Sequence, residues 1–478
     1  MDFFKKHWAD FSFLVGLVIF VCFKIPDLSI AYFWDELGVY VPGALKMKDD
    51  GTIGLLPANL EPLYSRGHPL LFVFSQAAWF ELFGDDVVTG HTFSLLLGVL
   101  TLIAFYWCSR NLAGSTVALV ASITLAAQPV FYAGAGVILP EMMLALFTIP
   151  AVWAIIRQRW WWYALWGSMA MMTKESAIVI PALALLVLFA ESIAAKDFFS
   201  RKRWKLFLIG LIPILVFALF LTIQRIQNGW FFFPLHVDLM NDVGTSLKYC
   251  FYISKDIYFG EGRYFSGVIL VITLLYFIFK SKQNGISRKA TVLTLLILIG
   301  TVFAACNFYM IRYILYFLPA VMFLSAWFVV RFAYKHKKPI FITTVISYTV
   351  VVVISCIVEM GDKRFRDTGD MSYKQVVLLK KEAITWLEKQ PFRNEIIGAN
   401  FPLFQAISDT RFGYVSSPIR YSENLKEKTC HAIWFYLNNQ RLDINTQRPF
   451  KIIKEFQNSQ ATIIIMSFQD CIYDLSSD

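Results

Sequence analysis

The sequence predicts a polytopic α-helical membrane protein with about eleven spans, one interfacial helix and a small C-terminal soluble α/β domain. Two features of composition support this. The 478 residues are 57% hydrophobic and only 16% charged, whereas about a quarter of a typical soluble protein is charged. The net charge of +10 in so apolar a chain indicates basic cytoplasmic loops and no nucleic-acid partner. A third observation is the change from long apolar runs to charge-rich sequence near residue 360.

Apolar runs of about 20 residues, long enough to cross a bilayer, define the expected spans. The candidates are 8–26, 87–108, 115–133, 138–156, 160–173, 175–193, 206–223, 265–280, 290–306, 312–330 and 339–358. The first run has no small-residue cleavage site after it, so we expect a membrane helix there and no signal peptide. The shorter run 68–83 contains Ser75, Gln76 and Glu81 and is expected to be interfacial or re-entrant.

Basic residues set the expected orientation, because Lys and Arg accumulate on the cytoplasmic side. Five basic segments share one side only if 68–83 does not cross the membrane. They are Lys5/Lys6, Arg157/Arg159, Lys196/Arg201/Lys202/Arg203/Lys205, Lys280/Lys282/Arg288/Lys289 and Arg331/Lys335/Lys337/Lys338. The N-terminus is then cytoplasmic. Loops 27–67 and 224–264 and the tail lie on the extracytoplasmic side, and the membrane is expected to be a bacterial cytoplasmic (inner) membrane.

The chain is expected to divide into a transmembrane domain, 1–359, and an extracytoplasmic α/β domain, 360–478. Helical spacing of apolar residues predicts a helix over 374–389. Short apolar runs predict buried strands at 395–399, 432–437 and 461–468. Cys430 and Cys471 both lie in this tail, and the sequence leaves a disulfide between them open.

Acidic residues lie at helix ends on the predicted external face, where ionisable residues are functional candidates. Asp35 and Glu36 follow Trp34 just after the first span. They are either ordinary solvated loop acids or a general base, a cation ligand or acceptors for sugar hydroxyls. Glu141 opens a later span, where it also complements the helix dipole.

Basic residues reach the same face. Arg66 and His68 precede the interfacial helix, and His68 could be no more than a neighbour of its cap. Lys174, beside Glu175, stands on the side where lysine is disfavoured, which indicates an anionic partner.

Arg312 and Tyr313 begin a late span on this face. The arginine either extends to lipid headgroups or forms forked contacts to a phosphate. Acids and cations on one face suit a lipid whose head is anionic and whose reaction needs a base.

The order of these motifs resembles that of GT-C fold glycosyltransferases. The motifs are the acid pair in "FWDELG", "HP" before the interfacial helix, "FELFG", the acid opening a span, "TKES" and "RYILYFLPA". The protein O-mannosyltransferases and the aminoarabinose transferases that modify lipid A are the most similar families. The resemblance covers about residues 30–195 and 305–330. It implies a GT-C type fold and transfer of a sugar, with inversion, from a polyprenyl-phosphate carrier to an extracytoplasmic acceptor.

The resemblance implies roles for individual residues of this sequence. Asp35 matches the catalytic acid, His68-Pro69 the "HPP" or "KPP" site and Glu141 the second acid. Lys174 matches the lysine of "LTKG", and Arg312 the arginine near the carrier phosphate. Leu70 replaces the second proline of the family and Glu175-Ser176 replaces Gly-Pro. These departures leave the identities of donor and acceptor open.

The expected reaction is a single displacement by a hexosyl or pentosyl transferase. Asp35, with Glu36 secondary, acts as the base, and Arg312, Lys174 and Arg66 stabilise the departing phosphate. The remaining substrate-binding candidates are His68, Glu141, Glu175 and Tyr313. The acceptor is a glycan, a lipid or a protein, and lipid A or another envelope glycan is favoured. No ligand cluster in the sequence compels a metal, although a divalent cation beside Asp35 and Glu36 stays open.

Two alternatives remain at this point. A transporter or flippase of a lipid-linked or anionic substrate would also have many spans and membrane-embedded charges, but such proteins usually show internal repeats, and none is visible. A non-catalytic membrane scaffold that presents the tail would leave the one-sided charge cluster unexplained.

Overall fold

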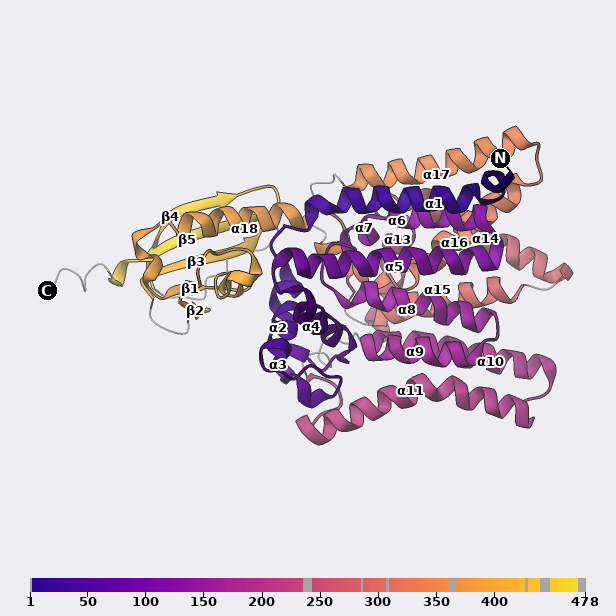
Figure 1. Ribbon diagram of the computed structural model, residues 1–478, viewed down its shortest axis with the longest axis horizontal. Coiled ribbons are helices and arrows are strands. Elements are labelled where there is room, and N and C mark those ends of the chain that lie inside the picture. Colours follow the sequence, from indigo (N-terminus) through magenta and orange to yellow (C-terminus); the bar gives the residue numbers. More distant parts are fainter. Residues whose placement is uncertain are drawn as a thin grey trace.

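The computed structural model of this chain describes residues 2–234, 243–284, 287–306, 309–360, 367–425, 429–438 and 448–471. Figure 1 shows a bundle of long helices with a sheet domain at one end. The N-terminus and the connection between α10 and α11 lie at the opposite end of the bundle. The side chains of Lys5, Lys6, Lys280 and Lys282 lie outside the described part of the chain.

Every predicted span falls on a helix of the bundle. The helices are α1 (Asp2–Lys24), α5 (Val87–Ala113), α6 (Ser115–Ala126), α8 (Pro140–Ile156), α9 (Trp160–Thr173), α10 (Val179–Ala195), α11 (Arg201–Asn228), α14 (Tyr264–Asn284), α15 (Arg288–Cys306), α16 (Leu318–Ala333) and α17 (Lys338–Met360). Among the described residues, six helices are long and apolar enough to cross a membrane, or seven if a bent pair counts as one span. Four shorter apolar helices accompany them. The number of spans therefore stays a prediction.

Two predicted spans are interrupted. The run 115–133 breaks after α6, and α7 (Pro129–Gly134) restarts with Pro129 at its first position, where proline needs no amide partner. The run 312–330 begins with η5 (Ile311–Ile314), a short 3₁₀ turn that precedes α16.

The region predicted as loop 224–264 contains a helix. α13 (Val243–Phe259) forms there and meets α14 at an angle of 111°. Lys248, Lys255 and Asp256 interrupt its apolar residues, so no apolar run of spanning length indicated it.

The segment predicted to lie in the interface is α4 (Leu71–Phe83), with 13 residues. It groups with α2 (Val41–Asp49) and α3 (Pro62–Ser65) at the end of the bundle that faces the sheet domain (Figure 1). A helix of this length is shorter than the about 20 residues that cross a bilayer. Its placement in the interface remains a prediction.

The C-terminal domain contains a five-stranded mixed sheet with the order β2-β1-β3-β5-β4. The strands are β1 (Ile397–Ala399), β2 (Tyr421–Glu423), β3 (His431–Leu437), β4 (Phe450–Gln457) and β5 (Ala461–Phe468). β1 pairs in parallel with β2 and β3, whereas β5 is antiparallel to β3 and β4. α18 (Tyr373–Leu387) packs against β4 and β5. The three predicted strands correspond to β1, β3 and β5. β2 and β4 form the sheet edges, and the charged, mostly exposed side chains of β4 suit an edge.

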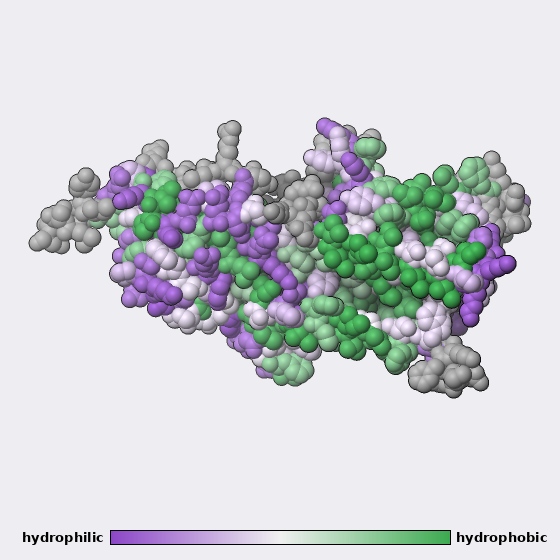
Figure 2. Space-filling view, turned by 90° about the horizontal axis from the view of Figure 1, so that it is seen from above, coloured by the Kyte–Doolittle hydropathy of each residue, from purple (hydrophilic) through white to green (hydrophobic). Residues whose placement is uncertain are grey.

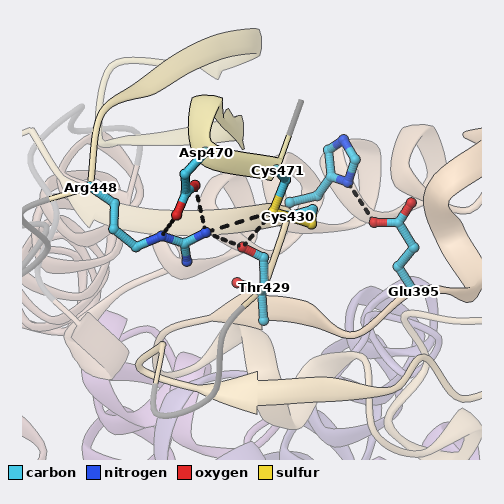
Figure 3. The surroundings of a disulfide bond; sticks show 7 residues. Glu395, Thr429, Cys430, Arg448, Asp470 and Cys471 are labelled. Carbon is cyan, nitrogen blue, oxygen red and sulfur yellow. Dashed lines mark hydrogen bonds and ion pairs between the residues drawn. A yellow bond between two sulfur atoms is a disulfide. The ribbon is translucent and has the colours of Figure 1, made fainter. Parts of the chain in front are cut away.

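A disulfide joins Cys430 to Cys471, with Cα atoms 5.5 Å apart. Cys430 directly precedes β3 and Cys471 follows β5, and these antiparallel strands bring the two ends together. Arg448 and Asp470 lie beside this bond (Figure 3). Nη2 of Arg448 lies 2.8 Å from Oδ1 of Asp470. The alternative that the sequence left open is therefore decided in favour of the disulfide.

Hydrophobic and hydrophilic residues separate along the long axis. Figure 2 shows hydrophobic residues over the bundle, and hydrophilic ones over the C-terminal domain and at the far end of the bundle. This distribution is that of a helical membrane domain that carries a domain outside the lipid.

Candidate active site

A cavity of about 190 Å³ collects residues from four separate parts of the chain. They come from the segment after α1, the turn before α4, the junction of α9 with η4 (Glu175–Ile178), and η5 with the end of α15. Seven of the nine predicted site residues line it, and Glu36 and Glu141 do not. The seven are Asp35, Arg66, His68, Lys174, Glu175, Arg312 and Tyr313.

Asp35 and Arg312 are bonded to each other across the cavity. The Nη2 of Arg312 donates to Oδ2 of Asp35. Arg312 is buried, whereas 27% of the Asp35 side chain is exposed. A second guanidinium nitrogen, Nη1, donates to the hydroxyl of Thr368 at 3.2 Å. The predicted base and the predicted phosphate ligand are thus paired with each other.

Lys174 is fixed by Glu141 behind the cavity wall. Its Nζ lies 2.6 Å from Oε1 of Glu141, and both side chains are buried. The same carboxylate oxygen lies 3.7 Å from Nε of Arg312. The ammonium also lies 4.3 Å from the centre of the Tyr313 ring. Glu141 therefore contacts both buried cations without reaching the cavity surface.

His68 and Glu175 form a third pair. Nδ1 of His68 lies 2.8 Å from Oε2 of Glu175, which brings the turn before α4 against η4. The ring of Tyr40 stacks near His68, with centroids 6.5 Å apart. This pair places a carboxylate and an imidazole, both partly exposed, at one side of the cavity.

Arg66 is the cation of the cavity that has no ion-pair partner within the described residues. Its backbone has a φ of 48°, and Gly67 follows with a φ of 74°. Two successive left-handed residues turn the chain sharply before His68. Arg66 is therefore available to an anion that enters the cavity.

Glu36 points away from the cavity, with 1% of its surface exposed. Its carboxylate accepts the backbone N–H groups of Ile138 at 2.6 Å and Phe33 at 2.8 Å. The Nε2 of His91 lies 3.1 Å from it. These contacts tie the segment after α1 to α5 and to the start of α8, and they occupy the Glu36 carboxylate.

Several residues of the site were missed in the sequence. His91 lies within a predicted apolar span. An ionisable residue at such a position indicates a functional or structural role, and this signal could have identified His91. Tyr40, Ser176 and Tyr316 also line the cavity. Tyr40 is the last residue of η2 (Glu36–Tyr40), a π-helical turn for which the sequence carries no signal. Among the described residues, no three His, Cys, Asp or Glu side chains form a group that could hold a metal ion.

Known proteins resemble this chain in part of its sequence and in its fold. The profile of the family dolichyl-phosphate-mannose-protein mannosyltransferase matches residues 67–221. No curated protein sequence matches the chain. ArnT from Cupriavidus metallidurans bound to undecaprenyl phosphate is similar in structure, with a TM-score of 0.61 and 12% identity, over 96% of this chain and 98% of that chain.

A second solved structure is the archaeal oligosaccharyltransferase AglB from Archaeoglobus fulgidus, in complex with an inhibitory peptide and a dolichol-phosphate. Its TM-score is 0.55 at 11% identity, over 90% of this chain and 70% of that chain. The predicted resemblance to GT-C glycosyltransferases is therefore confirmed. The predicted fold class, a helical membrane protein with a small C-terminal sheet domain, is confirmed as well.

Proposed function

We propose that this protein is an inverting glycosyltransferase that moves a sugar from a polyprenyl-phosphate carrier to an extracytoplasmic acceptor. The observation that carries the proposal is the cavity in which Asp35 is paired with Arg312 while Arg66 has no ion-pair partner among the described residues. It offers a carboxylate for a hydroxyl proton and a cation for a lipid phosphate within one small space. The fold shared with ArnT and AglB supports the same reading.

The donor phosphate would first meet Arg66, because this guanidinium is not already neutralised. Arginine binds phosphate oxygens in a forked geometry, so the phosphate also competes with Asp35 for Arg312. Lys174 adds positive charge to the wall, and Glu141 keeps it in place. Donor binding would therefore release the Asp35 carboxylate from its ion pair.

The released carboxylate of Asp35 would take the proton of an acceptor hydroxyl. The acceptor oxygen then forms a bond to the anomeric carbon as the bond from that carbon to the phosphate oxygen breaks. The electron pair leaves with the polyprenyl phosphate, and Arg312 and Arg66 stabilise its charge. If the acceptor were itself a phosphate, no base would be required and Asp35 would orient the acceptor.

We assign the remaining polar residues to binding and support. His68 and Glu175 face the cavity and offer hydrogen-bonding groups for sugar hydroxyls. Tyr313 packs against Lys174. Glu36, predicted as a secondary catalytic acid, instead supports the segment that carries Asp35, because its carboxylate is fully occupied by Phe33, Ile138 and His91.

We favour lipid A or another envelope glycan as the acceptor, with a protein hydroxyl as the other candidate. The site and the C-terminal domain are assigned to the extracytoplasmic side of a bacterial cytoplasmic membrane. Single-cysteine labelling tests this sidedness in spheroplasts, with Ser459→Cys in the exposed β4–β5 turn and Ser200→Cys before α11. An impermeant reagent should label Ser459→Cys alone. Labelling of Ser200→Cys alone would reverse the assignment.

Asp35→Asn tests the chemistry. Full-length protein in proteoliposomes is supplied with a bacterial lipid extract, and the release of free polyprenyl phosphate is followed by mass spectrometry. The variant should release carrier at least about 10²-fold more slowly, because it keeps the shape but loses the base. Undecaprenyl phosphate should still bind. Wild-type rates in Asp35→Asn would refute the proposal, as would translocation of lipid-linked sugar by the wild type without any release of carrier. Loss of activity with a chelator, and its return with a divalent cation, would instead place a metal beside Asp35.

A further inference from the structure

Trp34, which directly precedes Asp35, has a backbone conformation that bulky residues rarely adopt. Its φ is 40°, in the left-handed region. A bulky side chain at such a φ marks a turn or a strained site that its surroundings must enforce. Because Asp35 is the next residue, rotation of the backbone at Trp34 would move the Asp35 carboxylate. The question is which contacts hold Trp34 in this conformation.

The Trp34 ring contacts the neighbouring Phe33 ring at 5.9 Å and two rings of the C-terminal domain. The ring of Phe401 meets it edge to face at 5.3 Å, and that of Phe435, on β3, at 6.1 Å. Phe401 also approaches the backbone at Gly38, where a Cβ atom would lie 2.8 Å from its Cε2. Two aromatic residues far along the chain thus enclose the tryptophan beside the candidate base.

The C-terminal domain also binds the backbone at both ends of this segment, which we call the acid segment (residues 32–38). At one end, the N–H of Tyr32 donates to the carbonyl of Phe412 at 3.4 Å. The hydroxyl of Tyr414 donates to the carbonyl of Tyr32 at 2.8 Å. At the other end, the side-chain amide of Gln405 donates to the carbonyl of Gly38 at 3.4 Å.

The partner of Asp35 is held from the same side. Thr368, whose hydroxyl accepts from Arg312, belongs to the short turn η6 (Asp367–Gly369), which leads into the C-terminal domain. Both members of the Asp35–Arg312 pair therefore depend on contacts made by residues that follow α17.

We propose that the C-terminal domain positions the catalytic base, with Phe401 and Phe435 acting through Trp34. The inference rests on the proposed function, since it assigns Asp35 the role of base. A catalytic group must be held within about 0.5 Å of its working geometry by packed neighbours. Trp34 is the positioning residue, and the two phenylalanines fix its ring.

The domain is also attached by ion pairs that do not involve these rings. Lys374 on α18 forms an ion pair with Asp27, and Arg411 lies 3.0 Å from Asp49. Removal of the Phe401 ring should therefore release Trp34 while the domain stays docked. This separation makes the proposal testable in the full-length chain.

The principal experiment compares Phe401→Ala with Phe392→Ala. Phe392 is an aromatic residue of the same domain, but its ring stacks on His431 at 3.9 Å. With the carrier-release assay, Phe401→Ala should lower kcat about 10- to 100-fold. Binding of undecaprenyl phosphate and the melting temperature should stay near those of the control. Phe401→Tyr, which keeps the ring, should retain wild-type kcat. Equal kcat values for Phe401→Ala and Phe392→Ala would overturn the inference.

A second comparison separates positioning from a general loss of structure. In an Asp35→Asn background, Phe401→Ala should leave the residual rate unchanged, because there is no longer a base to misplace. A further drop in that background would show that Phe401 serves overall structure, and would overturn the inference.

Trp34→Gly separates the backbone conformation from the ring contacts. Glycine adopts a φ of 40° without strain but offers no ring to Phe401 and Phe435. The variant should lose kcat as Phe401→Ala does. Full activity would show that the backbone alone positions Asp35. If the wild type releases no carrier at all, the proposed function fails. If it does and only these variants behave as the control, the proposed function stands and the positioning role fails.

Discussion

Two buried lysines near the acid segment have different surroundings. At the cavity wall, Lys174 is 2.6 Å from the Glu141 carboxylate. At the interface with the C-terminal domain, the Nζ of Lys380 has no hydrogen-bond partner among the described residues. It lies 5.1 Å from the Phe33 ring and 5.4 Å from that of Tyr414.

The two lysines serve different purposes because their surroundings differ. A buried ammonium that is paired with a carboxylate keeps its charge and remains available to an anion nearby. Without such a partner, burial lowers the pKa of Lys380 to about 7, although the nearby Glu36 carboxylate opposes the shift. The cavity lysine is therefore suited to electrostatics, whereas the interface lysine mainly fills space between aromatic rings.

The largest expected effect is at the cavity wall. Lys174→Met leaves the buried Glu141 carboxylate without its closest partner, which should destabilise the protein by about 3–5 kcal/mol and abolish donor use. Thermal unfolding in detergent and the carrier-release assay measure the two effects. The double variant Lys174→Met/Glu141→Gln should recover most of the stability but not the activity. Recovery of both would show that Lys174 is structural only.

Arg312 provides the next largest effect, because it joins the cavity wall to the acid segment. Arg312→Ala should weaken binding of undecaprenyl phosphate strongly. Arg312→Lys should restore it only in part, since an ammonium lacks the fork that contacts two oxygens at once. Isothermal titration of the purified protein with undecaprenyl phosphate tests both variants. Unaltered affinity in Arg312→Ala would contradict the assignment of this residue to the donor phosphate.

The smallest expected effect is at the interface, and its sign is opposite. Lys380→Met replaces the buried amine by an apolar side chain of similar length. The variant should have a higher melting temperature at pH 7 and unchanged carrier release. The unfolded chain keeps the ordinary pKa of 10.5, and the folded chain has a pKa of about 7. Protonation of Lys380 therefore favours the unfolded state and lowers the free energy of unfolding, most strongly below pH 7. This loss of stability disappears as the pH rises towards 10.5. The advantage of Lys380→Met should shrink between pH 7 and pH 10. A constant advantage would show that the charge of Lys380 plays no part.

The same contrast explains how far the sequence could be interpreted. Lys174 stands between two apolar runs on the face predicted to be extracytoplasmic, where lysine is disfavoured, and Arg312 opens a predicted span, so both were visible as anomalies. Lys380 lies in an amphipathic helix where lysine is ordinary, and only the packing of Phe33 and Tyr414 against it makes it unusual. The local sequence pattern singles out a charged residue at an unusual position, such as Lys174. It does not single out Lys380, whose surroundings depend on tertiary contacts.

The acid pair shows a second limit. Asp35 and Glu36 are adjacent and chemically alike, and the sequence could rank them only by resemblance. In the structure Asp35 lines the cavity, whereas the Glu36 carboxylate contacts His91. Adjacent residues of a helical turn do not face the same way. The helices of the predicted spans and three of the five strands were predictable from the lengths of apolar runs, and α18 from helical spacing. The break before α7, the bend between α13 and α14 and the edge strands β2 and β4 were not, because packing against other elements determines them.

The ion pair between Asp35 and Arg312 also sets an order of events. An acceptor that bound first would meet an Asp35 carboxylate that is already paired with the Arg312 guanidinium, so its hydroxyl would bind that carboxylate weakly. Under the proposed function, the lipid-linked sugar would therefore enter before the acceptor. The spent carrier retains the same phosphate contacts and must depart before the ion pair re-forms. Free polyprenyl phosphate should accordingly inhibit in competition with the donor, and turnover should slow wherever empty carrier accumulates in the membrane.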